Sequence, residues 1–272
     1  MKRVLTARFM HETNTFSRVK TDMALIRRRD FHLDNAMILD AAAARGPIDG
    51  ALLHLHGAMV AQSHEGRPGD KPLVVADYTD NPGGGGYGDA TAFLAGLVAA
   101  GVGSVAFHAI CDPQAVQQGI AAGVGAKTTL VLGGKTDPPM GGGPLTLHGE
   151  IVCLTNGRFV AHGPMGGGLE RNYGPSMLFR VGGIDIVVIT NNGQATDLGQ
   201  FTSLGIDPTR YATVAVKSMQ HFRAAFAAIA RDIVLFDTGA LCAEVYTAEL
   251  FTKVRRPIWP LDPIADPQPA SV

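Results

Sequence analysis

Cysteine is scarce in this sequence, and the few cysteines present are not arranged in pairs. Cys111, Cys153 and Cys242 are far apart in a chain of 272 residues, and none belongs to a Cys-x-x-Cys motif. Their odd number and wide spacing exclude a disulfide framework. Each has apolar neighbours, so we interpret them as small buried hydrophobic residues rather than as nucleophiles.

A charge imbalance and long hydrophobic runs are also absent. With 23 basic and 24 acidic residues the formal net charge is −1, which argues against nucleic acid or an anionic membrane surface as a partner. No apolar run is long enough to span a membrane, and the N-terminus has no secretory signal pattern. We expect a cytoplasmic protein. A periplasmic location stays open, because a signal could have been removed.

Hydrophobic residues make up 46% of the sequence, which is enough for a sizeable core in one large or two modest domains. The first 66 residues contain only two apolar runs and one Ala-rich helix pattern at residues 34–45, and a piece this small is marginal by itself. We divide the chain into a shortened N-terminal domain at residues 1–66, a linker at 67–72, a C-terminal domain at 73–262 and a disordered Pro-rich tail at 263–272.

The C-terminal domain begins with the pattern of a parallel α/β fold. Apolar runs at 73–77 and 102–110 indicate strands, and helix patterns follow each of them at 89–100 and 113–122. Asp89 is the expected N-cap of the first helix. This order of strands and helices predicts parallel pairing.

The rest of the domain has a different secondary-structure pattern, with short β-like runs first and an α/β pattern after them. Short β-like runs between residues 128 and 190 are separated by Gly-rich and Asn-Gly turns, which is typical of antiparallel hairpins. A strand at 211–216, a helix at 218–230 and a strand at 233–237 follow. The sequence predicts an α/β protein with an N-terminal remnant of a parallel α/β domain and a C-terminal α/β domain that carries an antiparallel hairpin insertion.

Histidine and glutamate stand at the ends of the two N-terminal apolar runs. His-Glu-Thr-Asn-Thr-Phe at residues 11–16 follows the run at 4–9, and the run at 51–59 contains His54 and His56. Ligands bind at the carboxyl ends of strands in open α/β sheets, and His with Glu is a ligand set that zinc hydrolases use. Taken alone, Glu12 could instead cap a helix or lie in solvent.

Several motifs, in the same order along nearly the whole chain, resemble the M81 family of metallopeptidases. They are residues 11–16, Leu-His-Gly-Ala-Met at 55–59, Asp-Asn-Pro-Gly-Gly-Gly-Gly at 80–86, Lys-Ser at 217–218, His-Phe-Arg-Ala at 221–224 and Arg-Pro-Ile-Trp-Pro-Leu-Asp at 256–262. The resemblance implies a zinc-dependent hydrolase, with one Zn²⁺ per subunit, that degrades linearised microcystin and its short peptide products. It makes Glu12 and His56 the catalytic and metal-binding positions.

The family is considerably longer than this chain. Segments are missing between Asn35 and Ala36 and near residues 65–71, and no Asp-Leu-His, which supplies further metal ligands in the family, occurs here. Two ligands cannot reproduce the zinc shell that activates water. An inactive homologue that acts as a ligand-binding or subunit-interaction module is therefore the alternative, and a homo-oligomer is compatible with either.

Asn81, Gly84 and Gly85 belong to a glycine-rich loop between a strand and a helix. Consecutive glycines let N–H groups converge on an anion, so the loop is a candidate substrate contact. The alternative is a tight connection. It is not a Walker A loop, because no Gly-Lys-Ser/Thr follows.

His221 and Arg223 follow a strand and could bind a peptide carboxylate, although a solvated helix surface is an equal alternative. Asp77 and Asp80 could add carboxylates, but the sequence does not position them. We interpret the remaining histidines of this domain as structural: His108, His148 and His162.

Overall fold

The computed structural model describes residues 4–8, 50–54, 71–242, 248, 251–259 and 261–263. Contacts divide the chain into two units, Met1–Cys242 and Ala243–Val272, and each is considered by itself. The helix expected at 34–45, residues 67–70 of the expected linker and most of the expected tail lie outside the described residues.

Two strands are described in the N-terminal part. β1 (Val4–Arg8) and β2 (Gly50–His54) are paired in parallel, with Val4 opposite Gly50. They confirm the two strands expected there, over shorter spans.

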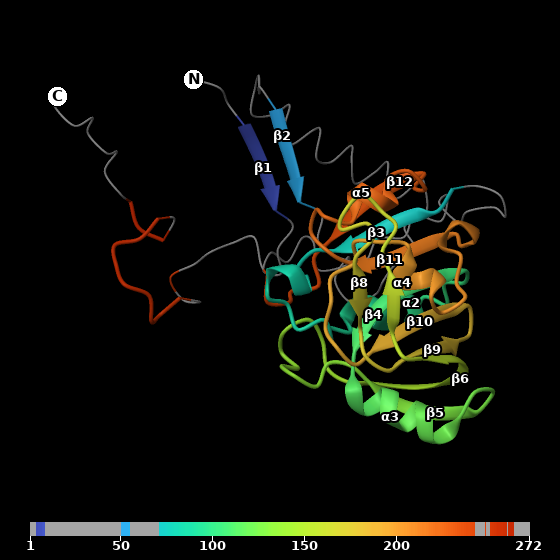
Figure 1. Cartoon of the computed structure of the whole chain (residues 1–272). Helices are drawn as coiled ribbons and strands as arrows, with labels where there is room; N and C mark the ends of the chain where they lie inside the picture. The colour runs from blue at the N-terminus through green and yellow to red at the C-terminus, as the bar shows by residue number, and fades with distance from the viewer. Residues whose placement is uncertain are drawn as a thin grey trace. The chain divides into compact units, whose positions relative to one another are not determined.

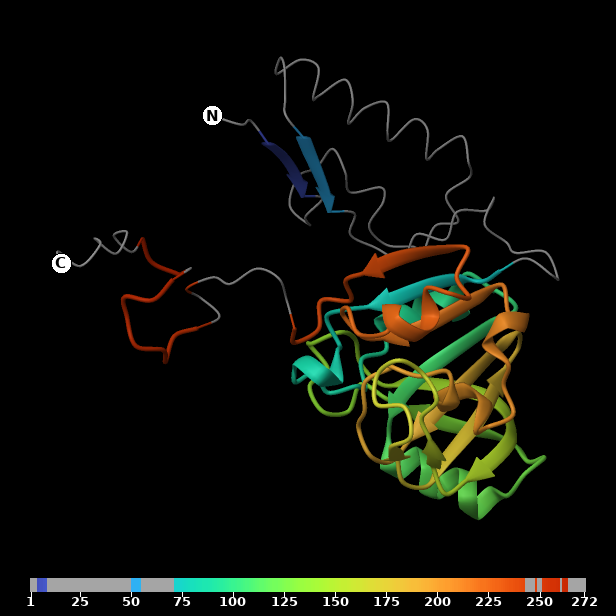
Figure 2. The same ribbon diagram turned by 45° about the horizontal axis from the view of Figure 1, so that its top comes forward.

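The main body is built on one eight-stranded sheet with the order β12-β3-β11-β4-β10-β9-β6-β5 (Figures 1 and 2). The first five of these are mutually parallel, and the last three continue the sheet in antiparallel pairing. The parallel strands are β3 (Leu73–Asp77), β4 (Val105–Cys111), β10 (Ile184–Ile189), β11 (Thr213–Lys217) and β12 (Asp232–Phe236). The antiparallel strands are β5 (Lys127–Leu132), β6 (Leu145–Thr155) and β9 (Ser176–Val181).

Both faces of the parallel strands are buried, which is why these strands are continuous apolar runs in the sequence. In β3, Leu73 and Val75 belong to one core cluster, and Val74 and Ala76 belong to the other. Helices α2 (Ala92–Ala99) and α3 (Pro113–Ala122) pack in the first cluster. The short helices α4 (Gly199–Thr202) and α5 (Arg223–Phe226) pack in the second. The expected α/β fold is confirmed.

The antiparallel hairpin insertion that the turn pattern indicated is confirmed, since β5 to β9 lie between β4 and β10 in the chain and pair only antiparallel. Three of its strands, β9, β6 and β5, extend the parallel sheet. Only β7 (Arg158–Val160) and β8 (Glu170–Asn172) form a small sheet of their own. β6 and β7 are joined by an Asn-Gly turn in which Gly157 has a φ of +68°. A side chain at position 157 would collide with the carbonyl oxygen of Gly174, so this turn requires glycine.

Two helix expectations were wrong in detail. The helix predicted at 218–230 is reduced to the four residues of α5, with turns on either side. Asp89 does not cap α2, because its carboxylate accepts N–H bonds from Lys135 and Thr136, at 3.0 and 2.9 Å. α2 begins at Ala92, after Thr91.

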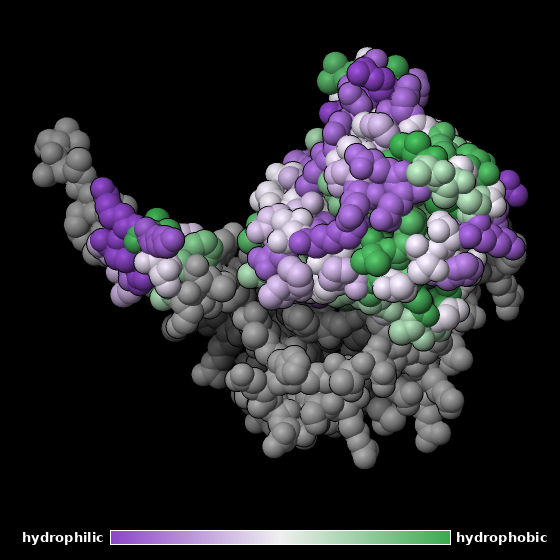
Figure 3. Space-filling view, turned by 90° about the horizontal axis from the view of Figure 1, so that it is seen from below, coloured by the Kyte–Doolittle hydropathy of each residue, from purple (hydrophilic) through white to green (hydrophobic). Residues whose placement is uncertain are grey.

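The surface mixes polar and apolar residues. In Figure 3, hydrophobic patches interrupt a mostly hydrophilic face, and the exposed apolar side chains of the described residues include Ile120, Val124 and Trp259. Among the described helices, none combines the length and the hydropathy that crossing a membrane requires.

Candidate functional site

The parallel register brings the carboxyl ends of β3, β11 and β12 to one edge of the sheet, and β10, which is parallel to β4 in the same sheet, also ends at this edge. Asp77, the last residue of β3, lies opposite Lys217 at the end of β11 and opposite Phe236 at the end of β12. In open α/β sheets this carboxyl edge is where ligands bind. The candidate site is therefore the set of loops that follow β3, β10, β11 and β12.

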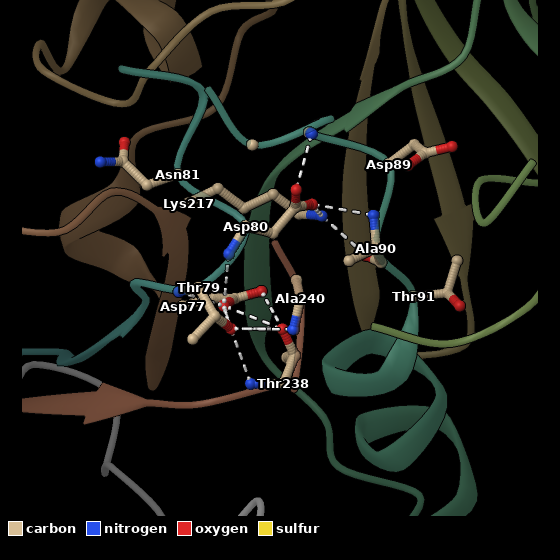
Figure 4. Close-up of polar contacts among 12 residues, drawn as sticks. Asp77, Thr79, Asp80, Asn81, Asp89, Ala90, Thr91, Lys217, Thr238 and Ala240 are labelled. Atoms are coloured by element: carbon tan, nitrogen blue, oxygen red, sulfur yellow. Dashed lines mark hydrogen bonds and ion pairs between the residues drawn. The ribbon is translucent and has the colours of Figure 1, made fainter. Parts of the chain in front are cut away.

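Asp77 is fully buried and its carboxylate is enclosed by protein donors (Figure 4). It accepts bonds from the Thr79 N–H and hydroxyl, from the Asp80 N–H and from the Thr238 hydroxyl, all at 3.0–3.2 Å. Burial raises the pKa of Asp77 to about 6, with a contribution from the negative charge of Asp80, while the ammonium of Lys217 and the hydrogen bonds oppose the shift.

Asp80 forms a buried ion pair with Lys217 (Figure 4). Its two carboxylate oxygens also accept the N–H groups of Gly88 and Ala90, at 2.7 and 2.8 Å, and the Lys217 ammonium donates to the Ala90 carbonyl at 2.6 Å. Burial by itself would raise the pKa of Asp80. The ammonium and the two N–H donors outweigh burial and lower it below its ordinary value. This pair ties both ends of the glycine-rich loop to β11.

Inside that loop the N–H groups are already occupied. Gly84 and Gly86 donate to the Asn81 carbonyl, Gly83 donates to the Asn81 side chain, and Gly85 donates to Pro82, which forms the short 3₁₀ helix η3 (Pro82–Gly84). Gly85, with a φ of +95°, closes this turn. The glycine N–H groups form the hydrogen bonds of the tight turn, so they are not available to bind an anion. Gly84 and Gly85 are nevertheless exposed.

Gln194 lies between this loop and His221. The Gln194 amide nitrogen donates to the Ser218 hydroxyl at 2.9 Å, and its amide oxygen lies 3.1 Å from Nδ1 of His221. A side chain at Gly83 would collide with the same Gln194 oxygen. His221, Gln194 and Gly83 therefore meet at the carboxyl edge, and His221 is exposed there.

Arg223 is held elsewhere. Its guanidinium donates to the Gln220 side chain at 3.0 Å and lies over the Phe222 ring, 5.4 Å from the ring centre. The described contacts bring His221, but not Arg223, to the glycine-rich loop.

Gln194 is a contributor that the sequence reasoning missed, whereas Lys217 was named only as part of a family motif and not as the partner of Asp80. Gln194 lies in the amide-rich stretch Asn-Asn-Gly-Gln that follows an apolar run, and Lys217 ends another apolar run. Polar residues directly after buried strands were the available signal.

His108 is buried in β4, and its ring lies beside the rings of Phe201 and Tyr173. Burial lowers the pKa of His108 to about 3, so its imidazole is neutral. Its Nε2 lies 3.4 Å from the Gln200 amide nitrogen. This environment supports the structural role expected for His108.

The cysteines are free thiols. Burial raises the pKa of Cys111 to about 11, and it also raises that of Cys242. Both are protonated at neutral pH, so they are poor nucleophiles.

The expected zinc ligands Glu12 and His56 lie outside the described residues. Among the described residues, no three His, Cys, Asp or Glu side chains are grouped so that they could hold a metal ion. The carboxylates of Asp77 and Asp80 are committed to protein donors. The described part of the site therefore does not fit a zinc shell.

Comparison with known proteins agrees with this architecture. Microcystinase C from Sphingomonas sp. is 30% identical over 193 residues, which are 71% of this chain and 36% of that protein. The crystal structure of a "Putative metallopeptidase" from Mesorhizobium sp. BNC1 is similar with a TM-score of 0.64 and 26% identity, over 72% of this chain and 39% of that one. This chain thus spans well under half the length of either relative.

A family model, described as the MlrC C-terminus, matches residues 75–253. The match begins within β3 and includes the glycine-rich loop, Gln194, Lys217 and His221. The chain belongs to the MlrC C-terminus family.

Proposed function

We propose that this chain is a metal-dependent peptide hydrolase of the microcystinase C type, acting on linearised microcystin and its short peptide products. The observation that carries the proposal is the match of residues 75–253 to the MlrC C-terminus, together with the relatives' names. The proposed cofactor is one Zn²⁺ per subunit. The cytoplasmic location and a homo-oligomer stay predictions.

In this proposal the described domain contributes a substrate-contacting edge and not the metal ligands. The exposed surface of Gly84 and Gly85, supported by Asn81, lies on the same edge as Gln194 and His221. Amide and imidazole groups suit a peptide main chain, which offers both donors and acceptors. Glu12 and His56 stay the proposed metal ligands.

The test measures the zinc content of the purified full chain and its hydrolysis of linearised microcystin. Turnover that falls by about 10²- to 10⁴-fold in Glu12→Gln would support a catalytic carboxylate, and His56→Ala should lose metal. His148→Gln is the matched control, because His148 is an exposed histidine bonded only to Thr129 among the described residues. A wild-type chain without bound metal and without turnover would refute the proposed activity.

The alternative is a non-catalytic module that binds a peptide or a sister subunit. The observation that favours it is the lack of a metal-holding group among the described residues. Calorimetric titration with linearised microcystin separates the two: binding without hydrolysis indicates the module, whereas hydrolysis excludes it.

A further inference from the structure

Gln194 lies where three loops of the carboxyl edge meet. Its side chain contacts the loop after β3 at Gly83 and the segment after β11 at Ser218 and His221. The Tyr173 hydroxyl and the Gln200 amide nitrogen donate to its backbone carbonyl, at 3.2 and 3.1 Å. Both the backbone and the side chain of Gln194 are therefore held by hydrogen bonds.

The orientation of the Gln194 amide follows from its neighbours. A Cβ placed on Gly83 would collide with the amide oxygen, whereas the amide nitrogen would be farther away, at 3.1 Å. The glycine hydrogen that replaces this Cβ thus points at the oxygen, which is an attractive C–H···O contact. With the amide reversed, N–H hydrogens would face that C–H group. The nitrogen consequently points at Ser218, whose side chain is fully buried.

This orientation determines the proton position on His221. The Gln194 oxygen can only accept a hydrogen bond, so Nδ1 of His221, at 3.1 Å, must be the donor. In a neutral imidazole the other nitrogen, Nε2, then carries the lone pair. His221 is exposed, and no bond to its Nε2 is found among residues 71–242.

We infer that Gln194 is a positioning residue that holds His221 in the Nδ1–H tautomer and leaves Nε2 as an outward-facing acceptor for an N–H group of a peptide. The identification of the ligand as a peptide rests on the proposed function. The inference also changes the chemistry expected from the sequence, because a neutral acceptor nitrogen favours a peptide N–H over a peptide carboxylate.

The test is the ¹⁵N NMR spectrum of the full chain labelled at histidine, recorded at a pH where imidazole is neutral. The sequence has nine histidines, and the His221 signals are identified by their loss in His221→Asn. We expect a protonated Nδ1 and an unprotonated Nε2 in the wild type. His148 provides the internal reference, since its Nδ1 is bonded to Thr129 and not to Gln194.

Two variants separate positioning from a general structural effect. Gln194→Met keeps the length of the side chain but has no acceptor, so His221 should shift toward the Nε2–H tautomer while the His148 signals stay in place. Gln194→Glu keeps an oxygen acceptor and should retain the Nδ1–H tautomer. A wild-type His221 protonated at Nε2, or an unchanged His221 in Gln194→Met, overturns the inference. None of these readouts needs turnover, so they stay interpretable if the proposed hydrolysis fails.

Discussion

At the scale of single residues, the surroundings shift the pKa values of two nearby carboxyl groups, Asp77 and Asp80, in opposite directions. Burial raises the pKa of Asp77, and its hydroxyl and N–H donors oppose this rise only in part. Asp80 contacts the ammonium of Lys217, and its pKa falls. The difference follows from which carboxylate receives the cation, because one ammonium cannot compensate the burial of two negative charges.

The raised pKa of Asp77 predicts a pH effect on stability. The folded chain keeps the Asp77 proton up to about pH 6, whereas an ordinary Asp releases it near 3.8. Between these values the folded state binds more protons, so a rising pH lowers the free energy of unfolding. The side chain in Asp77→Asn cannot titrate. As the pH rises through this window, the free energy of unfolding of the variant should therefore increase relative to that of the wild type by up to about 3 kcal/mol, at about 1.4 kcal/mol per pKa unit.

Urea unfolding of both proteins at about pH 4.5 and about pH 7 measures this difference, and comparison of the two proteins removes the pH dependence of all other groups. A constant offset between them at both pH values would contradict the assignment to Asp77.

Gly83 provides a second prediction at this scale. Gly83→Ala places a methyl group against the end of the Gln194 side chain. The flexible end of this side chain can move away at a small cost in free energy. The free energy of unfolding should change by less than about 1 kcal/mol, while the His221 NMR signals should shift as in Gln194→Met. Gly103→Ala is the matched control, since a Cβ there meets nothing within 4 Å. Equal His221 spectra in both variants would contradict the close approach of Gly83 and Gln194.

At the scale of elements, the buried pair of Asp80 and Lys217 joins the loop after β3 to the end of β11. Both side chains are at most 3% exposed. Removing one partner leaves an unpaired buried charge, which costs about 3–5 kcal/mol. The strand, the loop and the start of α2 are thereby stabilised as one unit.

Lys217→Met should accordingly lower the free energy of unfolding by about 3–5 kcal/mol and increase the amide hydrogen exchange of Gly88 and Ala90. Arg158→Met is the control at an exposed ion pair, where both partners are more than half exposed and the expected loss is below about 1 kcal/mol. Similar losses in the two variants would show that the Lys217 pair is not the stronger one.

At the scale of the whole molecule, both core clusters are formed by residues between Leu73 and Phe236. The sheet has α2 and α3 on one face and α4 and α5 on the other, so its parallel part is covered on both sides. A body with two covered faces contains what an independent domain needs.

A fragment of residues 71–242 should therefore fold by itself and unfold in one cooperative transition. Circular dichroism during thermal unfolding tests this, with the full chain as the reference. A fragment without a cooperative transition would show that the domain depends on residues outside this range.

The sequence by itself determined the α/β class and most parallel strands, because strands buried on both faces are continuous apolar runs that need no knowledge of their partners. It also marked the loop at Asn81, since glycines at positive φ are a local requirement. Only the tertiary structure decided that the loop's N–H groups are used internally, that Asp80 rather than Asp77 receives Lys217, and that Gln194 joins Gly83 to His221. These contacts arise from the pairing of strands distant in the chain, and no local pattern encodes which side chains that pairing brings together.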